Sequence, residues 1–154
     1  MPPGFEDKEY TLGGPAVAAP APPWTVEDDQ RRTLSLASMN GNVVVMDFWA
    51  TWCGPCQASL PKMQALYEEF RGRALKIVGL TWRESGDARA YFARKGIAYP
   101  IFPGDALAEA YGVNRAGIPT VFVIGPDGRV VDYFIGYFGE ERDKLLRETV
   151  TRSL

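Results

Sequence analysis

Two cysteines, Cys53 and Cys56, stand three positions apart in the segment WCGPC, and they are the only cysteines in this 154-residue chain. They follow VVVMDFWA, an apolar run that contains one charged residue, Asp47. The chain contains no histidine. This excludes Ser/His/Asp and Cys/His catalysis and removes the commonest transition-metal ligand. Any proton transfer must therefore fall to a carboxylate, a lysine or a thiol.

The elements around the cysteines indicate what the thiols could do. Residues 43–50 are nearly all apolar and rich in β-branched side chains, which predicts a strand buried on both faces. The apolar spacing of residues 56–70 predicts a helix. Cys53 would then lie at the helix N-terminus, where free backbone N–H groups and the helix dipole favour the thiolate and lower the pKa of the thiol.

The turn between the cysteines suits a disulfide that opens and closes. Gly54 and Pro55 fit a tight turn, and proline is favoured at the start of a helix. Cys56, one turn further along, is close enough to bond to Cys53 and should be more covered. We therefore expect Cys53 to be the exposed attacking thiol and Cys56 the buried resolving thiol.

Other roles for a Cys-x-x-Cys pair remain open at this level. A structural disulfide is one, although a loop this short would stabilise the fold by only about 2 kcal/mol in the chain-entropy model. A zinc or iron–sulfur site needs four ligands, which this chain could supply only by sharing the site across a dimer. The pair could also be inert and reduced. A redox-active pair is favoured, because Cys-x-x-Cys beside a βαβ pattern is typical of thioredoxin-like proteins.

The remaining pattern predicts one α/β domain with a mixed sheet. A second buried strand at residues 75–82 completes a right-handed βαβ unit. Two later strands joined by a short turn should pair antiparallel. The other predicted elements are short extended pieces at 24–26 and 33–36, a helix at 88–95 ended by Gly96, a strand at 99–102, a helix at 106–112, strands at 120–125 and 129–136, and a helix at 139–152 with Leu145, Leu146 and Val150 inward.

Composition limits the class of protein. The chain is 46% hydrophobic and 23% charged with a formal net charge of −2, which is typical of a globular domain. Its basic residues form no stripe, so we expect no nucleic-acid partner. No apolar run is long enough to span a bilayer, and no signal-peptide pattern opens the chain. Residues 1–22 form a Pro/Ala-rich arm that should add little to the core, and residues 23–154 form the domain.

Several stretches resemble one protein family. WCGPC resembles the thioredoxin active site, and VVVMDFWATWCGPCQASLPKM is similar to the TlpA/ResA-like branch of the thioredoxin superfamily. The resemblance extends over about residues 20–152 and includes APPWTVEDDQRRTLSL, YPIFPGDALAEAYGV and GIPTVFVIGPDGRVV. It implies a thioredoxin fold, a central mixed sheet flanked by helices, with the TlpA/ResA-type insertion before a cis-proline.

The resemblance also implies roles for the cysteines. Cys53 attacks a substrate disulfide, and Cys56 then resolves the mixed disulfide. Asp47 is the candidate proton acceptor for Cys56. Burial should raise the pKa of this carboxyl group, since it shares a strand face with Val43 and other apolar side chains.

A substrate site follows from the same resemblance. Trp52 is expected to form part of an apolar platform in the active-site loop. The Ile118–Pro119 bond is expected to be cis, with Thr120 beside it. The Ile118 backbone would then pair with an extended segment of the substrate, as a strand added to a sheet edge.

Three positions depart from the resemblance. Many members of the branch have asparagine where Asp47 stands. They often have an acidic residue where Ser59 stands. Gly79 occupies the place of the lysine that accompanies the buried aspartate in plain thioredoxin.

The sequence and the resemblance together predict a thiol-disulfide oxidoreductase that reduces protein disulfides and needs no metal or organic cofactor. The Gly-Pro pair between the cysteines resembles that of thioredoxin and favours a reductant. Electrons would come from a membrane thiol transporter or a thioredoxin reductase system. We expect a monomer outside the cytoplasm, periplasmic or membrane-anchored, with its leader absent from this chain and a role in cytochrome c biogenesis. A cytoplasmic location, a Cu(I)-binding module on two thiolates and a thiol peroxidase are the alternatives.

Overall fold

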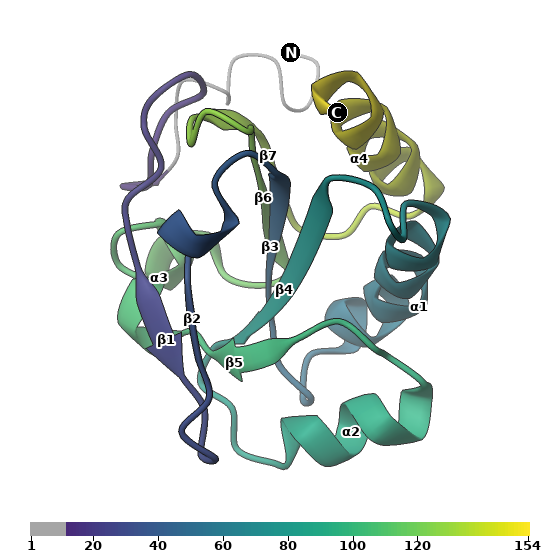
Figure 1. The fold of residues 1–154 in the computed structure, drawn as a ribbon. Coiled ribbons are helices and arrows are strands. Elements are labelled where there is room, and N and C mark those ends of the chain that lie inside the picture. Colours follow the sequence, from purple (N-terminus) through teal and green to yellow (C-terminus); the bar gives the residue numbers. More distant parts are fainter. Residues whose placement is uncertain (1–11) are drawn as a thin grey trace.

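A five-stranded mixed sheet forms the centre of the computed structural model, which describes residues 12–154 (Figure 1). The strand order is β5-β4-β3-β6-β7. β3 pairs parallel with β4 and antiparallel with β6, and β7 pairs antiparallel with β6. The predicted mixed α/β sheet is therefore confirmed. The strands are β3 (Val43–Trp49), β4 (Leu75–Thr81), β5 (Ile101–Pro103), β6 (Thr120–Ile124) and β7 (Val130–Ile135).

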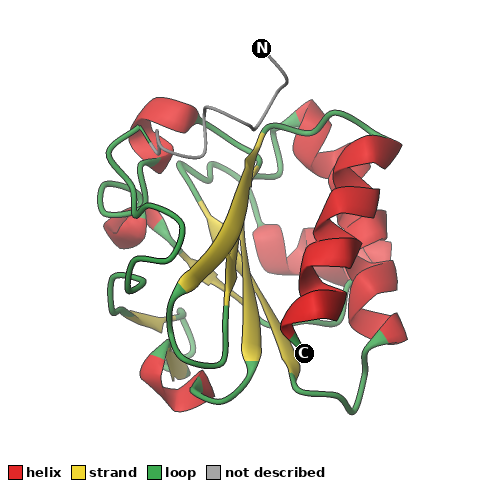
Figure 2. Ribbon diagram, turned by 90° about the horizontal axis from the view of Figure 1, so that it is seen from above, coloured by secondary structure: helices red, strands yellow, loops and turns green. Residues whose placement is uncertain are grey.

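Both faces of the sheet are covered, which explains why β3 is apolar along almost its whole length. Three helices pack on one face, and the hairpin of β1 and β2 packs with α3 on the other (Figures 1 and 2). The covering elements are α1 (Gly54–Glu69), α2 (Ala88–Lys95) and α4 (Glu140–Ser153) on the first face, and β1 (Thr25–Glu27), β2 (Thr33–Ser35), α3 (Val113–Ala116) and two short 3-10 helices (Ala37–Met39 and Asp105–Leu107) on the second. None of the helices within residues 12–154 is long and apolar enough to cross a membrane.

The alternation of side chains along β3 decides what faces the helices. Val43, Val45 and Trp49 pack in the apolar cluster that includes α1 and α4. Asp47 lies between them in the alternation and therefore points to the same face. This confirms the strand face expected for Asp47.

The prediction of a helix at residues 106–112 is wrong. The structure has a 3-10 helix at Asp105–Leu107, a turn, and then α3 from Val113. Gly112 adopts a left-handed conformation with φ 74°, which interrupts a right-handed helix at that residue. The buried Tyr111 side chain is held nearby, because its hydroxyl donates a hydrogen bond to the Pro22 carbonyl oxygen at 2.6 Å.

The last helix differs from its prediction in one inward position. Leu145 is 36% exposed, whereas Leu146 and Val150 are buried as predicted. The buried positions of α4 follow the spacing i, i+4, i+7, i+8 of one helix face. They are Arg142, Leu146, Thr149 and Val150. The inward face therefore begins with a charged residue.

Part of the N-terminal arm contacts the domain more than its composition suggests. The Ala18 and Ala21 amides donate hydrogen bonds to the carbonyl oxygens of Val130 and Gly128, and Val130 donates one back to Ala19. Ala21 is also buried. Residues 1–11 of the predicted arm lie outside the described residues, and the boundary at residue 22 stays a prediction.

Removal of residues 1–22 should therefore destabilise the protein measurably. It deletes three backbone hydrogen bonds and the partner of the Tyr111 hydroxyl. At roughly 0.5–1.5 kcal/mol for each bond, the melting temperature should fall by roughly 5–10 °C. Calorimetry on the full and shortened chains measures this. An unchanged melting temperature would support the original expectation that the arm adds little.

Candidate active site

The two cysteines form a disulfide at the start of α1, with 5.2 Å between their Cα atoms. Cys53 is the N-cap residue of the helix, and its sulfur accepts a hydrogen bond from the backbone N–H of Cys56 at 3.2 Å. Pro55 lies in the first turn, where its missing N–H leaves no donor unsatisfied. When the disulfide is reduced, this N–H group and the helix dipole stabilise negative charge on the Cys53 sulfur.

Cys53 is less exposed than the sequence analysis expects. It is 5% exposed, against 1% for Cys56, so the expected order holds but the expected exposure is wrong. Both sulfurs belong to the apolar cluster beneath α1. The carbonyl oxygen of Ile118 also lies 3.9 Å from the Cys53 sulfur and covers part of it. Only a narrow side of Cys53 is open to a partner.

The loop opposite the cysteines contains the predicted cis bond between Ile118 and Pro119. Thr120 is buried, and its hydroxyl donates a hydrogen bond to the Gly117 carbonyl oxygen at 2.7 Å. Gly136, just after β7, donates its N–H to the Pro119 carbonyl oxygen at 2.7 Å. Thr120 thus stabilises the loop, while the Ile118 carbonyl faces Cys53.

Two large apolar side chains are exposed near these loops. Trp52 is 51% exposed, and its indole N–H donates a hydrogen bond to the Arg83 carbonyl oxygen at 2.9 Å. Phe138 is 49% exposed and follows Gly136 by two residues. The sequence analysis identified Trp52 from its position beside Cys53. It missed Phe138, because nothing in the local pattern relates this residue to the cysteines.

Glu84, in the loop after β4, holds the residue that precedes Trp52. Its carboxylate accepts hydrogen bonds from the Thr51 amide at 2.8 Å and the Thr51 hydroxyl at 2.5 Å. From the other side, the Gln57 side-chain amide donates to the Thr51 carbonyl oxygen at 2.6 Å. The backbone entering the active-site turn is therefore fixed by side chains from two elements. The sequence offered no sign of this, since Glu84 lies 33 residues from Thr51.

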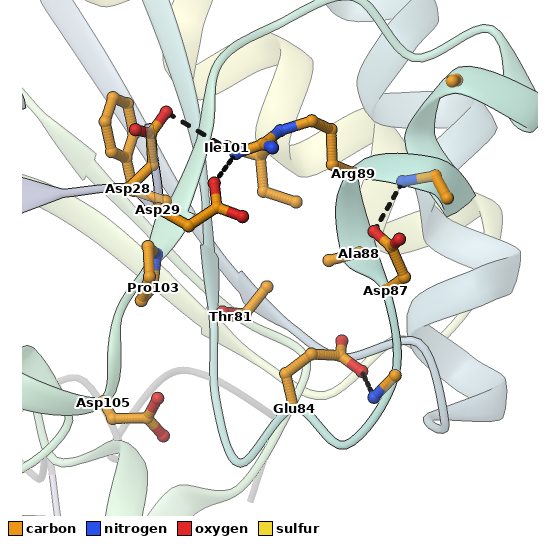
Figure 3. Close-up of a pocket in the computed structure, with 14 residues that line it drawn as sticks. Asp28, Asp29, Thr81, Glu84, Asp87, Ala88, Arg89, Ile101, Pro103 and Asp105 are labelled. Atoms are coloured by element: carbon orange, nitrogen blue, oxygen red, sulfur yellow. Dashed lines mark hydrogen bonds and ion pairs between the residues drawn. The ribbon is translucent and has the colours of Figure 1, made fainter. Parts of the chain in front are cut away.

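A pocket of about 800 Å³ adjoins this loop and contains neither cysteine (Figure 3). Its lining is rich in carboxylates, but these have structural partners. Arg89 lies 3.8 Å from Asp28 and forms an ion pair with Asp29 (Figure 3). Asp87 caps α2 by accepting the Ala90 amide at 3.0 Å. The pocket therefore shows no group prepared for chemistry.

Asp47 lies on the sheet face that α1 covers, with almost no contact with water. It is 1% exposed, and neither carboxylate oxygen has a hydrogen-bond partner among residues 12–154. Burial raises the pKa of Asp47 to about 7, although the Arg142 guanidinium and the Tyr99 hydroxyl act to lower it. Across the sheet Asp47 pairs with Gly79, as the resemblance implied, so β4 supplies no cation at that position. Asp47 can therefore exchange a proton near neutral pH.

Arg142 is a further site residue that was not predicted from the sequence. It projects from α4 and is fully buried, and its Nη2 donates a hydrogen bond to the Ser59 hydroxyl at 2.5 Å. Arg142 precedes Leu146 by four residues and Val150 by eight. This spacing on one helix face is the sequence signal that indicates a buried position for Arg142.

The described residues offer little to a metal ion beyond the two cysteines. No group of three or more His, Cys, Asp or Glu side chains within residues 12–154 is placed to hold a metal. The arrangement instead suits disulfide exchange: two sulfurs at a helix N-terminus, and a buried carboxyl group with a pKa of about 7 on the sheet face that this helix covers.

Comparison with known proteins finds a matching family model and curated relatives. The model of the AhpC/TSA family matches residues 17–133. The thiol-disulfide oxidoreductase ResA of Bacillus thuringiensis (strain Al Hakam) is 32% identical over 135 residues, which cover 86% of this chain and 75% of that protein.

Solved structures share the fold. A thioredoxin-family thiol:disulfide interchange protein from Chlorobium tepidum TLS superposes with a TM-score of 0.74 at 26% identity, covering 90% of this chain and 97% of that one. A secreted thiol-disulfide isomerase from Corynebacterium glutamicum gives a TM-score of 0.72 at 20% identity, covering 84% of each chain. The expected thioredoxin fold is confirmed.

Replacement of Asp47 by asparagine should change how stability depends on pH. Because the pKa of Asp47 is about 7 in the folded protein against 3.8 for an ordinary aspartate, the folded state binds more protons between these values. The free energy of unfolding of the wild type should therefore fall as pH rises through that window. The stability of Asp47→Asn relative to wild type should grow by on the order of 4 kcal/mol between pH 4 and pH 8.

Urea unfolding at a series of pH values measures this difference. Asp29→Asn is the matched control, since it removes an exposed carboxylate from the surface and should leave the pH dependence of the wild type in place. An Asp47→Asn protein with the same pH dependence as wild type would show that Asp47 ionises at an ordinary pH.

Proposed function

The chain belongs to the AhpC/TSA family and is a thiol-disulfide oxidoreductase, and from this premise we propose that it reduces protein disulfides through Cys53 and Cys56. One observation carries this proposal. Cys53 caps α1 and accepts the Cys56 N–H on its sulfur, and α1 packs on the sheet face that carries a buried carboxyl group with a pKa of about 7.

The exchange proceeds in two steps. The Cys53 thiolate attacks one sulfur of the substrate disulfide, and the other substrate sulfur leaves as a thiolate that takes up a proton from water. Cys56 then attacks Cys53, and the first substrate sulfur leaves as a thiolate that is protonated in the same way. Asp47 accepts the proton that Cys56 loses in this second step. The protein ends with the Cys53–Cys56 disulfide, and two electrons must come from a donor protein.

The substrate would be held beside Cys53. An extended segment pairs with the Ile118 backbone, and its apolar side chains contact the exposed Trp52 ring. The carbonyl of Ile118 lies 3.9 Å from the Cys53 sulfur, which supports this placement. Because Cys53 is only 5% exposed, a segment that presents its disulfide on an extended strand fits better than one buried in a folded core.

The partners and location also belong to the proposal. The protein acts as a monomer outside the cytoplasm, on exported thiol proteins such as apocytochrome c, and receives electrons from a membrane thiol transporter. Support comes from the resemblance to the TlpA/ResA-like branch and from a neighbour of the same fold that is named as secreted. A thioredoxin reductase system is the donor if the protein is cytoplasmic.

Insulin reduction with cysteine variants tests the assigned roles. Wild type should reduce insulin with dithiothreitol as electron donor, and Cys53→Ser should be inactive. Cys56→Ser should accumulate a mixed disulfide through Cys53, which mass spectrometry detects. A mixed disulfide formed by Cys53→Ser instead would reverse the roles. Failure of the wild type to reduce insulin, together with tight Cu(I) binding or peroxide consumption, would favour one of the alternative functions.

Asp47→Ala tests the proton acceptor. Because no histidine can replace the carboxylate, turnover at pH 6–7 should fall by roughly 100-fold or more, in line with the usual contribution of a general base. Alkylation of Cys53 by iodoacetamide should change less than turnover, since the helix N-terminus that stabilises its thiolate is intact. Wild-type turnover by Asp47→Ala across this pH range would show that Cys56 loses its proton to solvent.

A further inference from the structure

The guanidinium of Arg142 is buried with only part of its hydrogen bonding satisfied. Its side chain has 0% exposure. Nη2 donates hydrogen bonds to the Ser59 hydroxyl at 2.5 Å and to Asp143 at 3.2 Å. Nε and Nη1 have no hydrogen-bond partner in the part of the chain that the structure describes. A buried cation is costly unless a negative group compensates it, so the surroundings of Nε and Nη1 need an explanation.

The position of this guanidinium relates it to the cysteines. Ser59 lies on α1 three residues after Cys56, which is about one helical turn. α4 and α1 lie side by side on the same face of the sheet (Figures 1 and 2). The Asp47 carboxyl group points to this same helix-covered face and, like Nε and Nη1 of Arg142, is buried without a hydrogen-bond partner among residues 12–154; the positive charge of the guanidinium acts to lower its pKa. Arg142 thus contacts the turn of α1 that follows Cys56, on the face of the sheet that carries Asp47.

We propose that Arg142 is a positioning residue for disulfide exchange, because its buried charge keeps the Asp47 carboxylate available to receive the proton of Cys56. The inference rests on the proposed function and adds a residue to it. Ser59 is a neutral acceptor, so it holds the guanidinium at α1 without cancelling its charge. The charge therefore remains effective at Asp47.

The other titratable groups around Asp47 are few, which makes the effect of Arg142 separable. From the segment before β5, the buried Tyr99 hydroxyl faces Asp47 and also lowers its pKa. From α1 comes the Cys56 thiol. The neighbouring strands place Gly79 and Val121 opposite Asp47, and neither can titrate.

The groups around Arg142 itself include one competing carboxylate. Asp143, next to it on α4, pairs with Nη2 at 3.2 Å and accepts a hydrogen bond from the Tyr137 hydroxyl at 2.8 Å. The Tyr137 ring lies against the guanidinium, with 4.5 Å from the ring centroid to the central carbon. The negative charge of Asp143 offsets part of the electrostatic effect of Arg142 on Asp47. Removal of the Asp143 charge should therefore change the pKa of Asp47 in the opposite direction to removal of the Arg142 charge.

The test is the pH profile of insulin reduction by the full chain. Arg142→Met and Arg142→Gln remove the charge, and Gln can still donate a hydrogen bond to Ser59. Both should move the rising limb of the profile to higher pH, with turnover about tenfold lower at pH 6.5 and recovered at alkaline pH. Arg142→Lys, which keeps the charge, should restore most of the wild-type profile. Arg152→Met, on the exposed end of the same helix, is the matched control and should leave the profile unchanged.

Two further arms keep the inference falsifiable. In the Asp47→Asn background, Arg142→Met should produce no additional shift. Asp143→Asn should move the rising limb to lower pH, and it tests the inference even if the neutral variants at position 142 do not fold. The inference would be overturned if the rising limb did not move in the neutral variants, or if it moved equally in Arg142→Lys. Insulin reduction by the wild type would still support the proposed function in either case. An unshifted limb in Asp143→Asn would overturn the inference as well.

Discussion

The exclusion of water from the Asp47 carboxyl group is the constraint on which the rest of the site depends. β3 is the central strand, and helices cover the face to which Asp47 points. Desolvation exceeds the opposing effects of Arg142 and Tyr99, and the pKa rises from 3.8 to about 7. A carboxyl group in water would be permanently ionised at neutral pH and a weak base, whereas this one can gain and lose a proton there. The packing of an apolar core thus supplies the titrating group that a chain without histidine otherwise lacks.

The same packing explains why the neighbours of Asp47 are as they are. A Cβ atom on Gly79, across the strand pair, would come within 3.2 Å of the Trp49 indole nitrogen and 3.4 Å of the Tyr99 ring. A side chain at that position would therefore require these rings to shift by a few tenths of an ångström. Cys53 is the N-cap of α1, and the backbone before it is held by Glu84 through Thr51. The sulfur chemistry and the proton chemistry therefore share one rigid unit, made of β3 and the first turns of α1.

Local sequence patterns predicted the parts of the site that are close together in the chain. The strand before the cysteines, the helix after them and the buried face of Asp47 all follow from residues 43–70, where apolar periodicity is strong. The long-range parts were missed. Glu84 reaches Thr51 from a loop, and Arg142 reaches Ser59 across 83 residues. A charged residue is expected on the outside of an amphipathic helix, so the pattern does not predict Arg142 inward, whereas it does predict Leu145 there. The helix predicted from the composition of residues 106–112 is likewise interrupted, at Gly112. The burial of Tyr111 beside it depends on tertiary contacts, which a local pattern does not contain.

The most direct test of this account is the pKa of the Asp47 carboxyl group itself. Selective 13C labelling of aspartate and NMR titration of the oxidised protein between pH 3 and pH 9 would follow its carboxyl carbon, with Asp47→Asn to assign the signal. The account predicts one aspartate signal that titrates near pH 7, well apart from the signals of the exposed aspartates. If the Asp47 signal titrated near pH 4 with the others, the carboxyl group would be solvated or fully paired in solution. The proton acceptor assigned to Cys56, and the role of Arg142 with it, would then be wrong.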